Sequence, residues 1–385
     1  MEAERTDAAV VGGGAAGLAA AAMLGREGVR AIVLEAGPEV GAAWRTRYDR
    51  LHLHTPRLLS GLPGYRIPRE LGRWLERDAV LRYLQDYAAA HSLDVRVGTR
   101  VERIESDGDG WLLQTSAGRI RAEEAVVATG FSSVPRLPDW PGGESFRGEL
   151  LHSSDYRNPE PFQGRDVLVV GSGNSGSEIA VDLAENGAGR VRIAIRTPPH
   201  IARRAALGIP AQAVGIALMH LPPRTAARIS GTLRKLTIPD LSGHGLPRPS
   251  ESLGAQFART GTIPILDVGF VDAVRARRVE VVAAVEALDG DEVVLADGSR
   301  IRPEVVLAAT GFLAGLEPLV GHLGVLDERG LPRDDEPVPG LHFLGFRPTL
   351  GGMLRKVAID SRALARRVSR RRVGAPELPA PAPIL

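Results

Sequence analysis

Two short glycine-rich runs are the residues in this chain whose types and spacing most clearly indicate chemistry. They cover residues 12–17 (Gly-Gly-Gly-Ala-Ala-Gly) and 171–176 (Gly-Ser-Gly-Asn-Ser-Gly). Each follows four apolar residues and opens a stretch with helical periodicity. Such glycines let the backbone turn tightly and approach a pyrophosphate at a helix N-terminus, where free N–H groups favour anions. Two such turns predict two bound dinucleotides, which suits a chain that passes electrons between them.

The residues after the second predicted strand of each half distinguish the two sites. Residues 31–34 predict a strand followed by Glu35, which could accept hydrogen bonds from a ribose diol and would repel a 2′-phosphate. In the second half, residues 191–195 occupy the equivalent place, and Arg196 stands where the first half has Glu35. A cation suits a 2′-phosphate, so the first site indicates FAD or NAD and the second NADPH. Because the chain is rich in Arg, a merely solvated Arg196 is the alternative.

Composition removes several other kinds of chemistry. The chain has no cysteine, which excludes disulfides, thiolate metal sites and thiol catalysis. The nine His are scattered, and the pair His52 and His54 supplies too few ligands for a metal, so we expect none. Ser175 fails the Gly-x-Ser-x-Gly nucleophile pattern because residue 177 is Ser. The net charge of +2, without a basic run that includes aromatics, gives no reason to expect nucleic acid as a partner.

The elements that must position these residues follow an order that occurs twice. Residues 125–131 and 304–312 both read as a strand that ends in Ala-Thr-Gly-Phe, behind a probable hairpin. This repetition indicates an internal duplication of architecture. A C-terminal strand (341–345) and helix (358–368) are expected to return to the first domain, because so small a remnant could not bury a core alone. The other expected elements are strands at 7–11 and 94–101, helices at 15–27 and 77–90, and hairpins at 111–115/119–122 and 292–295/300–301.

The predicted fold is α/β, with a Rossmann-like FAD-binding domain (1–160 and 301–373) and an inserted NADPH-binding domain (161–300). Within the insert, residues 205–260 have no counterpart in a minimal nucleotide domain and are expected to cover the substrate pocket. Residues 205–223 come nearest to a membrane segment, but their length and Pro210 favour an amphipathic helix. We expect no integral membrane segment and, since no signal peptide is evident, a cytoplasmic protein. The Pro-rich residues 374–385 are predicted to be disordered.

The segment between the two glycine runs reads Phe146-x-Gly148-x-x-x-His152-x-x-x-Tyr156. From the residues alone it is a loop pinned between domains. Placed between FAD-type and NADPH-type fingerprints, it resembles the identifying motif of FMO-type (class B) flavin monooxygenases. The chain is similar to their YUCCA branch, the indole-3-pyruvate monooxygenases, over about residues 7 to 370. The similarity is carried by residues 44, 48–51, 167–180 and 264–269 and by both Ala-Thr-Gly segments.

The resemblance implies that NADPH reduces FAD, that O2 gives a flavin C4a-(hydro)peroxide, and that one oxygen atom reaches a small organic substrate. It implies catalytic roles for His54 and His152. Mammalian-type members carry an Asn near the flavin, but residues 51–56 contain none, so His54 and Thr55 are the polar groups best placed there; a structural His54 is the alternative. The expected cofactor-binding residues are Gly12, Gly14, Gly17, Glu35, Trp44, Thr55, Val101, Thr129, Gly130, Gly171, Ser172, Gly173, Asn174, Ser175, Gly176, Arg196, Thr310 and Gly311.

Several functional alternatives stay open. The substrate could be a 2-oxo acid or a nitrogen or sulfur nucleophile, and Arg355 is a candidate cation for a carboxylate. Tyr156 replaces the Trp typical of Baeyer–Villiger enzymes, which lowers that alternative without excluding it. A reductase that passes electrons to a protein partner, and a redox-responsive binding protein, are the other classes. A homodimer is possible.

Overall fold

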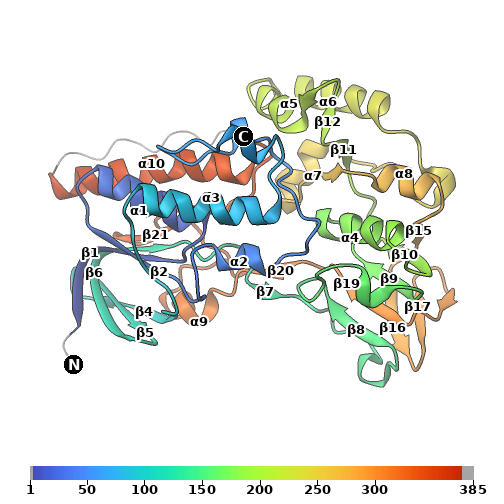
Figure 1. The fold of residues 1–385 in the computed structure, drawn as a ribbon, viewed down its shortest axis with the longest axis horizontal. Coiled ribbons are helices and arrows are strands. Elements are labelled where there is room, and N and C mark those ends of the chain that lie inside the picture. The colour runs from blue at the N-terminus through green and yellow to red at the C-terminus, as the bar shows by residue number, and fades with distance from the viewer. Residues whose placement is uncertain (1–2, 375–385) are drawn as a thin grey trace. The chain divides into compact units, whose positions relative to one another are not determined.

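The computed structural model describes residues 3–374, and the chain divides into two compact units (Figure 1). Unit 1 comprises Met1–Thr46, Leu51–Val134 and Phe312–Leu385, and unit 2 comprises Arg47–Arg50 and Pro135–Gly311. The domain boundaries predicted from the sequence lie after residues 160 and 300. The division differs because strands β8 (Glu149–His152) and β19 (Val305–Ala308) pair with each other inside the sheet of unit 2. Residues 375–385 of the predicted disordered tail lie outside the described residues.

Unit 1 is built on a seven-stranded sheet of order β3-β2-β1-β6-β5-β4, with β21 also paired to β6. Strands β3, β2, β1, β6 and β21 are parallel, whereas β4, β5 and β6 form antiparallel hairpins. The apolar end of β1 is buried on both faces, as expected of a central parallel strand. The strands are β1 (Glu4–Val11), β2 (Ala31–Leu34), β3 (Asp94–Arg96), β4 (Val101–Asp107), β5 (Gly110–Thr115), β6 (Gly118–Val127) and β21 (Leu341–Phe343).

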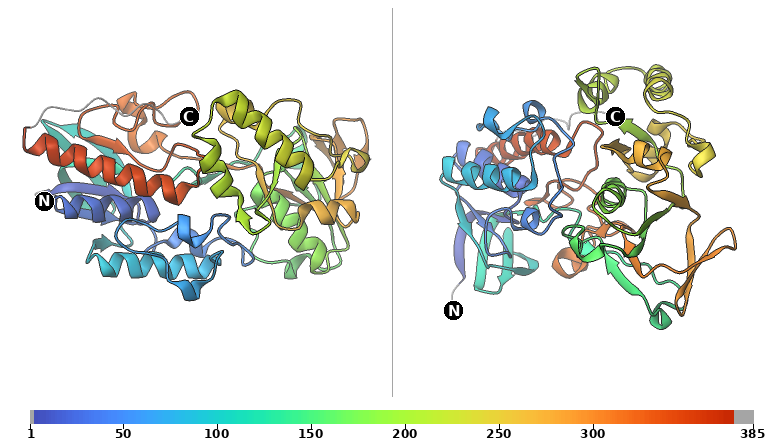
Figure 2. Two further views of the ribbon diagram at one scale, coloured as in Figure 1. Left: turned by 90° about the horizontal axis from the view of Figure 1, so that it is seen from above. Right: turned by 45° about the vertical axis from the view of Figure 1, so that its right-hand side comes forward.

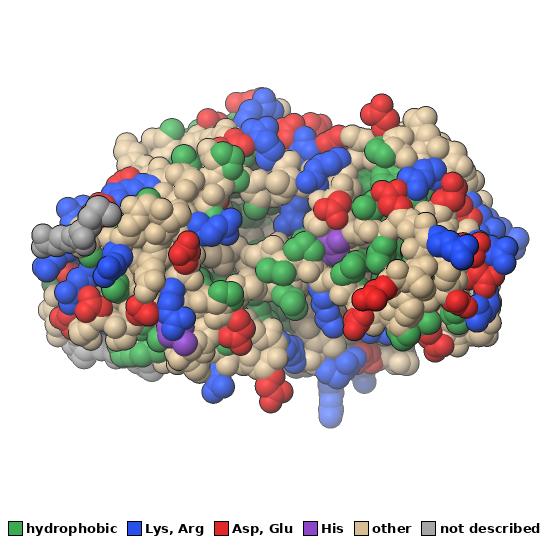
Figure 3. Space-filling view, turned by 90° about the horizontal axis from the view of Figure 1, so that it is seen from below, with side chains coloured by type: hydrophobic (Ala, Val, Ile, Leu, Met, Phe, Trp, Pro, Cys, Tyr) green, Lys and Arg blue, Asp and Glu red, His purple; other side chains and the backbone are tan. Residues whose placement is uncertain are grey.

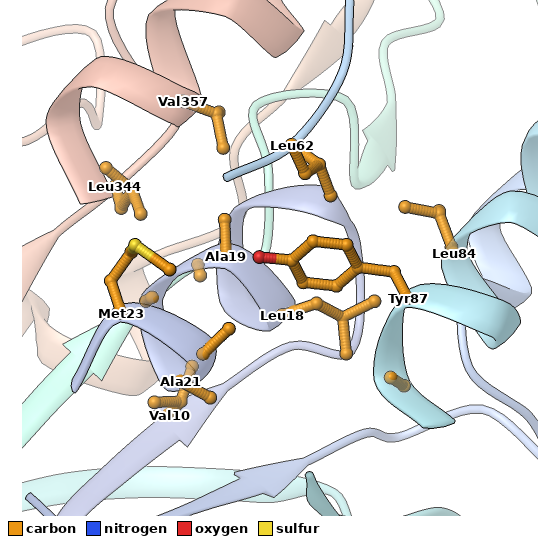
Figure 4. Close-up of a cluster of buried hydrophobic side chains, with 14 of the residues drawn as sticks. Val10, Leu18, Ala19, Ala21, Met23, Leu62, Leu84, Tyr87, Leu344 and Val357 are labelled. Atoms are coloured by element: carbon orange, nitrogen blue, oxygen red, sulfur yellow. The ribbon is translucent and has the colours of Figure 1, made fainter. Parts of the chain in front are cut away.

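Three helices cover one face of this sheet: α1 (Ala15–Arg26), α3 (Arg77–Ala90) and α10 (Met353–Arg372). Helices α1 and α10 run side by side in both views of Figure 2, and the alanine-rich face of α1 allows their close approach. Figure 4 shows the core on this face, where Leu18 of α1 lies beside Tyr87 of α3 and Met23 of α1 lies beside Leu344. A second core on the opposite face includes residues of α9 (Glu317–Val320). The C-terminal strand and helix thus pack on the first domain, as predicted.

Three predicted elements of unit 1 need correction. The strand expected at 94–101 is interrupted by a turn at Gly98, where φ is +66°, so β3 ends at Arg96 and β4 begins at Val101. The stretches 119–122 and 125–127 form one continuous strand, β6. Helix α10 begins at Met353, five residues before the predicted start. The prediction missed this first turn because the many Arg residues of the helix hide the periodicity of its buried residues, which include Leu354.

Unit 2 contains a five-stranded parallel sheet of order β15-β10-β9-β19-β8. Helices α4 (Asn174–Glu185) and α8 (Phe270–Arg275) lie together beside it. The remaining strands of this sheet are β9 (Asp166–Val170), β10 (Arg190–Ala194) and β15 (Glu280–Val282). An antiparallel sheet contains β16 (Val285–Asp289), β17 (Glu292–Leu295) and β18 (Arg300–Ile301), which confirms the predicted hairpin. Short strands β7 (Val134–Pro135) and β20 (Phe312–Leu313) pair where the chain passes between units.

Residues 205–260 form a small hairpin and three helices rather than one amphipathic helix over 205–223. The prediction was wrong because Leu207 and Gly208 both adopt positive φ and turn the chain. A two-stranded parallel sheet of β11 (Ile201–Arg203) and β14 (Ile265–Asp267) flanks this segment. Within residues 3–374, no helix combines the length and apolar composition needed to cross a membrane. The elements are β12 (Ala205–Ala206), β13 (Ile209–Pro210), α5 (Ala211–Leu218), α6 (Pro223–Thr237) and α7 (Leu253–Thr260).

Charged side chains of both signs are interspersed over the face shown in Figure 3. Many charged side chains of the described residues form ion pairs, such as Arg190 with Glu280 in unit 2 and Arg96 with Glu4 in unit 1. Exposed pairs of this kind contribute little to stability, so the hydrophobic cores of the two units are the main source of folding free energy.

Candidate functional site

The first glycine turn joins β1 to α1 in unit 1. Gly12 has φ of +112°, and its N–H donates to the Leu34 carbonyl at 2.8 Å. A Cβ added to Gly12 would lie 2.7 Å from the Ala128 carbonyl oxygen, and one added to Gly17 would lie 1.9 Å from the Gly12 carbonyl oxygen. Both contacts are shorter than real side chains tolerate, so the tight turn and the close packing of helix on strand require glycine at these two positions.

Gly14 differs from these two glycines because it faces open space. A Cβ built there meets no protein atom within 4 Å, although Gly14 is the N-cap of α1. Among the described residues, no side chain caps this end of the helix. The first turn therefore offers backbone N–H groups beside open space, and this cradle fits the pyrophosphate of a dinucleotide.

Glu35 is fixed beside the same turn. Its Oε2 accepts from the Gly13 N–H and its Oε1 from the Gly37 N–H, both at 2.6 Å. A Cβ at Gly13 would lie 2.9 Å from this carboxylate. The two backbone bonds orient the Glu35 side chain, as the predicted role at a ribose diol requires.

The second glycine turn, in unit 2, repeats the first closely. Gly171 also has φ of +112°, and its N–H donates to the Ala194 carbonyl at 3.1 Å. An added Cβ would lie 2.5 Å from the Ala309 carbonyl oxygen, and one on Gly176 would lie 2.0 Å from the Gly171 carbonyl oxygen. Gly173 faces open space at the N-cap of α4, as Gly14 does at α1. The internal duplication expected from the sequence is confirmed at the level of single glycines.

The hydrogen bonds of the two turns show that Arg196, contrary to the prediction from the sequence, is not at the position equivalent to Glu35. Leu34 and Ala194 are equivalent because each accepts from the first glycine of its turn. Ile195, not Arg196, therefore stands where the first half has Glu35, and Arg196 comes one residue later. In this register the second half still lacks an acid at the position of Glu35, and the exposed guanidinium of Arg196 follows one residue later.

The Ala-Thr-Gly segments follow the equivalent strands β6 and β19. Gly130 and Gly311 have φ of +80° and +89°, so both ends turn in the same way. The Thr310 hydroxyl donates to the Arg136 carbonyl. Thr129 and Gly130 lie in unit 1, whereas Thr310 and Gly311 lie in unit 2 with the second glycine turn. The domain limits predicted from the sequence place residues from 301 on in the FAD domain.

The other predicted cofactor residues of unit 1 lie on separate short elements. Trp44 is in helix α2 (Ala42–Arg45), where it packs against the main core, and Val101 begins β4. The Thr55 hydroxyl accepts from Ser60 Oγ at 2.7 Å. His54 precedes it and is half-buried. His54 belongs to unit 1 and His152 to unit 2.

His152 is buried, and both of its ring nitrogens make hydrogen bonds. Nε2 donates to the Gly311 carbonyl at 3.0 Å, and Nδ1 accepts from the Ser154 N–H at 3.1 Å. Burial lowers the pKa of His152, although the Gly311 carbonyl opposes this effect. These contacts favour the neutral ring and connect residues 146–156, the linker motif, to the second Ala-Thr-Gly segment.

The rest of the linker motif anchors this loop. Gly148 lies under the Phe146 ring, since an added Cβ would be 2.6 Å from that ring. The Tyr156 hydroxyl donates to Asp182 Oδ2 of α4 at 2.7 Å, and both residues are buried. Burial first, and then the Asp182 carboxylate, raise the pKa of Tyr156 well above its ordinary value.

Helix α4 has an acidic face that holds residues 47–50 and that was not predicted from the sequence. The Tyr48 hydroxyl donates to Glu178 at 3.0 Å, and burial followed by that carboxylate raises the Tyr48 pKa. Arg50 donates to Glu185 at 2.6 Å and lies 3.5 Å from Asp182. The spacing of the three acids, i, i+4 and i+7, could have indicated this face.

Unit 1 also contains a buried charged cluster that is separate from the glycine turn. His342 Nε2 lies 2.7 Å from Glu124, and Arg371 of α10 contacts both Glu124 and Glu336. Although burial alone would raise it, the pKa of Glu336 is lowered by His342 and Arg371. Two carboxylates and an imidazole can ligate a metal, but here Arg371 pairs with both carboxylates and Arg367 pairs with Glu336.

Comparisons with known proteins agree with this geometry. Residues 9–208 match the family model described as pyridine nucleotide-disulphide oxidoreductase. The indole-3-pyruvate monooxygenase YUCCA1 of Oryza sativa subsp. japonica is 35% identical over 350 residues, covering 88% of this chain and 86% of its own. A flavin-containing monooxygenase structure from Stenotrophomonas maltophilia is 26% identical with a TM-score of 0.73, covering 96% of this chain and 99% of its own.

The structure of OTEMO in complex with FAD and NADP shares the fold, with a TM-score of 0.70 at 19% identity, and the match covers 97% of this chain and 87% of that one. The absence of cysteine separates this chain from the dithiol chemistry in the name of the matched family model. The chain uses FAD and NADPH and oxygenates a small substrate with O2. Neither the Baeyer–Villiger nor the reductase alternative is favoured. The chain therefore belongs to the flavin-dependent monooxygenase family, with the YUCCA indole-3-pyruvate monooxygenases among its relatives.

Proposed function

We propose that the turn after β1 binds FAD and that the turn after β9 binds NADPH. The observation that carries this assignment is the duplicated cradle, since Gly14 and Gly173 leave the same open space at uncapped helix N-termini. Glu35 stands beside the first cradle, and Arg196 follows the end of β10 at the second. When bound, FAD and NADPH supply the hydride transfer and the reduction of O2.

The chain's own residues bind, orient and hold protons around these cofactors. Glu35 accepts from the ribose of FAD, and Arg196 pairs with the 2′-phosphate of NADPH. His152 acts through its neutral ring, which holds the Gly311 carbonyl in place, so we assign it a positioning role; a catalytic role for His152 stays a prediction, as does one for His54. Trp44, Thr55, Val101 and the two Ala-Thr-Gly segments are proposed to line the cofactors.

For the substrate we propose a 2-oxo acid, because relatives that are 30–35% identical to this chain are named indole-3-pyruvate monooxygenases. In overall stoichiometry, R–CO–COOH, O2, NADPH and H⁺ give R–COOH, CO2, NADP⁺ and H2O. Arg355, in the first turn of α10, is the cation that we propose for the carboxylate. Its position supports this, because the positive end of the helix dipole also favours an anion.

The cofactor assignment is tested with Arg196→Ala, assayed with NADPH and NADH. Loss of the guanidinium should raise KM for NADPH about tenfold or more and leave KM for NADH nearly unchanged, since only NADPH carries the 2′-phosphate. Arg190→Ala is the control, because Arg190 begins β10, the strand that precedes Arg196, and pairs with Glu280. If the ratio of KM for NADPH to KM for NADH is unchanged in Arg196→Ala, Arg196 does not bind the 2′-phosphate. The domain limits, a pocket-covering role for residues 205–260, a homodimer and a cytoplasmic location stay predictions.

A further inference from the structure

The side chain of Asn174 makes two hydrogen bonds to a segment ninety residues further along the chain. Asn174 is the first residue of α4 and follows Gly173 of the second glycine turn. Its Oδ1 accepts from the Leu266 N–H at 2.7 Å, and its Nδ2 donates to the Pro264 carbonyl at 3.4 Å. Both bonds are with the segment that forms β14, within unit 2.

The position of β14 explains why an amide is needed there. Backbone groups of successive residues in a strand point to opposite edges. The Ile265 N–H donates to the His200 carbonyl at 2.8 Å, on the edge that pairs with β11. The Pro264 carbonyl and the Leu266 N–H therefore face the other edge, where β14 has no strand neighbour among the described residues. The Asn174 amide, with one donor and one acceptor, takes the place of that strand.

This pairing commits the Asn174 side chain to the protein. The sequence predicts that Asn174 binds the cofactor, but both polar atoms of its side chain contact Pro264 and Leu266. The group of Asn174 left to bind the cofactor is therefore its backbone N–H. The side chain instead connects the glycine turn to β14. Asp267, at the end of β14, caps the start of α8 by accepting from the Val271 N–H at 3.0 Å.

The same small sheet connects to the segment 205–260. Strand β11 runs directly into this segment, and β14 follows it in the chain. Arg203 at the end of β11 lies 3.5 Å from Asp267 of β14 and donates to the Thr237 carbonyl at the end of α6 at 3.3 Å. A shift of the glycine turn would therefore be passed through Asn174 to β14, and from β14 to both ends of the segment.

We propose that Asn174 is a positioning residue that couples NADPH binding at the second glycine turn to the order of residues 205–260. The proposal rests on the proposed NADPH site. By linkage, if NADPH binding stabilises this segment, the segment must in turn strengthen NADPH binding by the same factor. Removal of the Asn174 amide should break the coupling in both directions while the FAD site, in unit 1, is unaffected.

The experiment compares the FAD-loaded wild type with Asn174→Ala and with Asn186→Ala. Asn186 is the matched control, because its amide donates to the Asp182 carbonyl at the other end of α4. We expect Asn174→Ala to raise KM for NADPH about tenfold, with kcat changed far less and with FAD content close to wild type. Asn186→Ala should leave KM for NADPH unchanged.

Limited trypsin digestion measures the coupling directly, since Arg224, Arg228 and Lys235 are exposed on α6. Saturating NADP⁺ should slow cleavage there at least about fivefold in the wild type and in Asn186→Ala, but not in Asn174→Ala. Because NADP⁺ is saturating, a loss of protection in Asn174→Ala reports lost coupling and not weaker binding. If Asn174→Ala does not fold, Asn174→Asp serves, because a carboxylate keeps the acceptor for Leu266 and loses the donor to Pro264.

A wild-type KM and undiminished NADP⁺ protection in the Asn174 variants would overturn the proposal, as would a wild type that NADP⁺ does not protect. Failure of the proposed function is recognised separately through Arg196→Ala. If neither the Arg196 nor the Asn174 variants change KM for NADPH, the assignment of NADPH to this turn is wrong. If only Arg196→Ala raises KM for NADPH, the assignment of NADPH to this turn is correct and the proposed coupling through Asn174 is wrong.

Discussion

Single glycines carry the clearest link between sequence and function in this chain. Gly12 and Gly171 have the same φ, the same hydrogen bond to the second strand and the same close contact with the strand on the other side. Gly14 and Gly173 have no such protein contact. The first pair is therefore required by the fold, and the second pair by whatever lies in the cradle.

This distinction predicts different results for two alanine variants of the first turn. Gly12→Ala should destabilise the protein by about 1–3 kcal/mol, because alanine is strained at a positive φ and its Cβ meets the Ala128 carbonyl. Gly14→Ala should leave the stability of the FAD-free protein unchanged and weaken FAD binding about tenfold, because its Cβ enters the open cradle. The checks are thermal denaturation and FAD titration. Equal stability losses in the two variants would contradict this division.

His152 should make the stability of the protein depend on pH. Its pKa is lowered in the folded state by burial, so the unfolded chain, with an ordinary pKa of about 6.5, binds the proton first as pH falls. The stabilisation is therefore complete above about pH 6.5 and is lost as pH falls toward the folded pKa. Between pH 7.5 and pH 5.5, the wild type should lose more unfolding free energy in urea than His152→Gln does. Identical losses would contradict a neutral, buried His152.

At the scale of elements, helix α4 is held by its acidic face as well as by the sheet. Tyr48, Arg50 and Tyr156 each contact an acid on this face. The linker motif, which ends in Tyr156, thus contacts α4, the helix after the second glycine turn, through one buried hydroxyl. Residues 47–50 join unit 2 by the same means, although their neighbours in the chain belong to unit 1.

Tyr156→Phe should lower the stability of the protein by about 1–3 kcal/mol, because it leaves the buried Asp182 carboxylate without its best donor. Thermal denaturation monitored by circular dichroism measures the effect. Tyr65→Phe is the control, since Tyr65 contacts Tyr83 and Tyr87 through its ring. A Tyr156→Phe melting temperature equal to that of the control would show that the hydroxyl adds nothing.

Much of the fold could be predicted because its signals are local. The glycine turns, helix α3 and β2 follow directly from spacing and periodicity, and the predicted bounds of the last two agree with the structure. The start of α10 and the hairpin at Leu207 could not be predicted, because an Arg-rich helix hides its buried stripe and a Leu at positive φ is rare. The roles of Asn174 and His152 depend on partners far along the chain, which no local pattern contains.

At the scale of the whole molecule, two copies of one turn have acquired different surroundings. Glu35 lies beside the first, whereas the second has Ile195 in that register and Arg196 after it. A chain with FAD at one turn and NADPH at the other contains a source of electrons and a centre that can react with O2. The lack of cysteine leaves the flavin as the place where those electrons are used.

The most direct test of this account is turnover of indole-3-pyruvate by the FAD-loaded protein with NADPH under ¹⁸O2, followed by mass spectrometry of the product. We predict a carboxylic acid one carbon shorter that contains one ¹⁸O atom, formed in equal amount to the NADPH consumed. Parallel reactions with a thioether and a tertiary amine cover the other substrate classes. If NADPH is oxidised but all of the oxygen is recovered as H2O2, with no labelled product from any of the three, the protein is not the monooxygenase described.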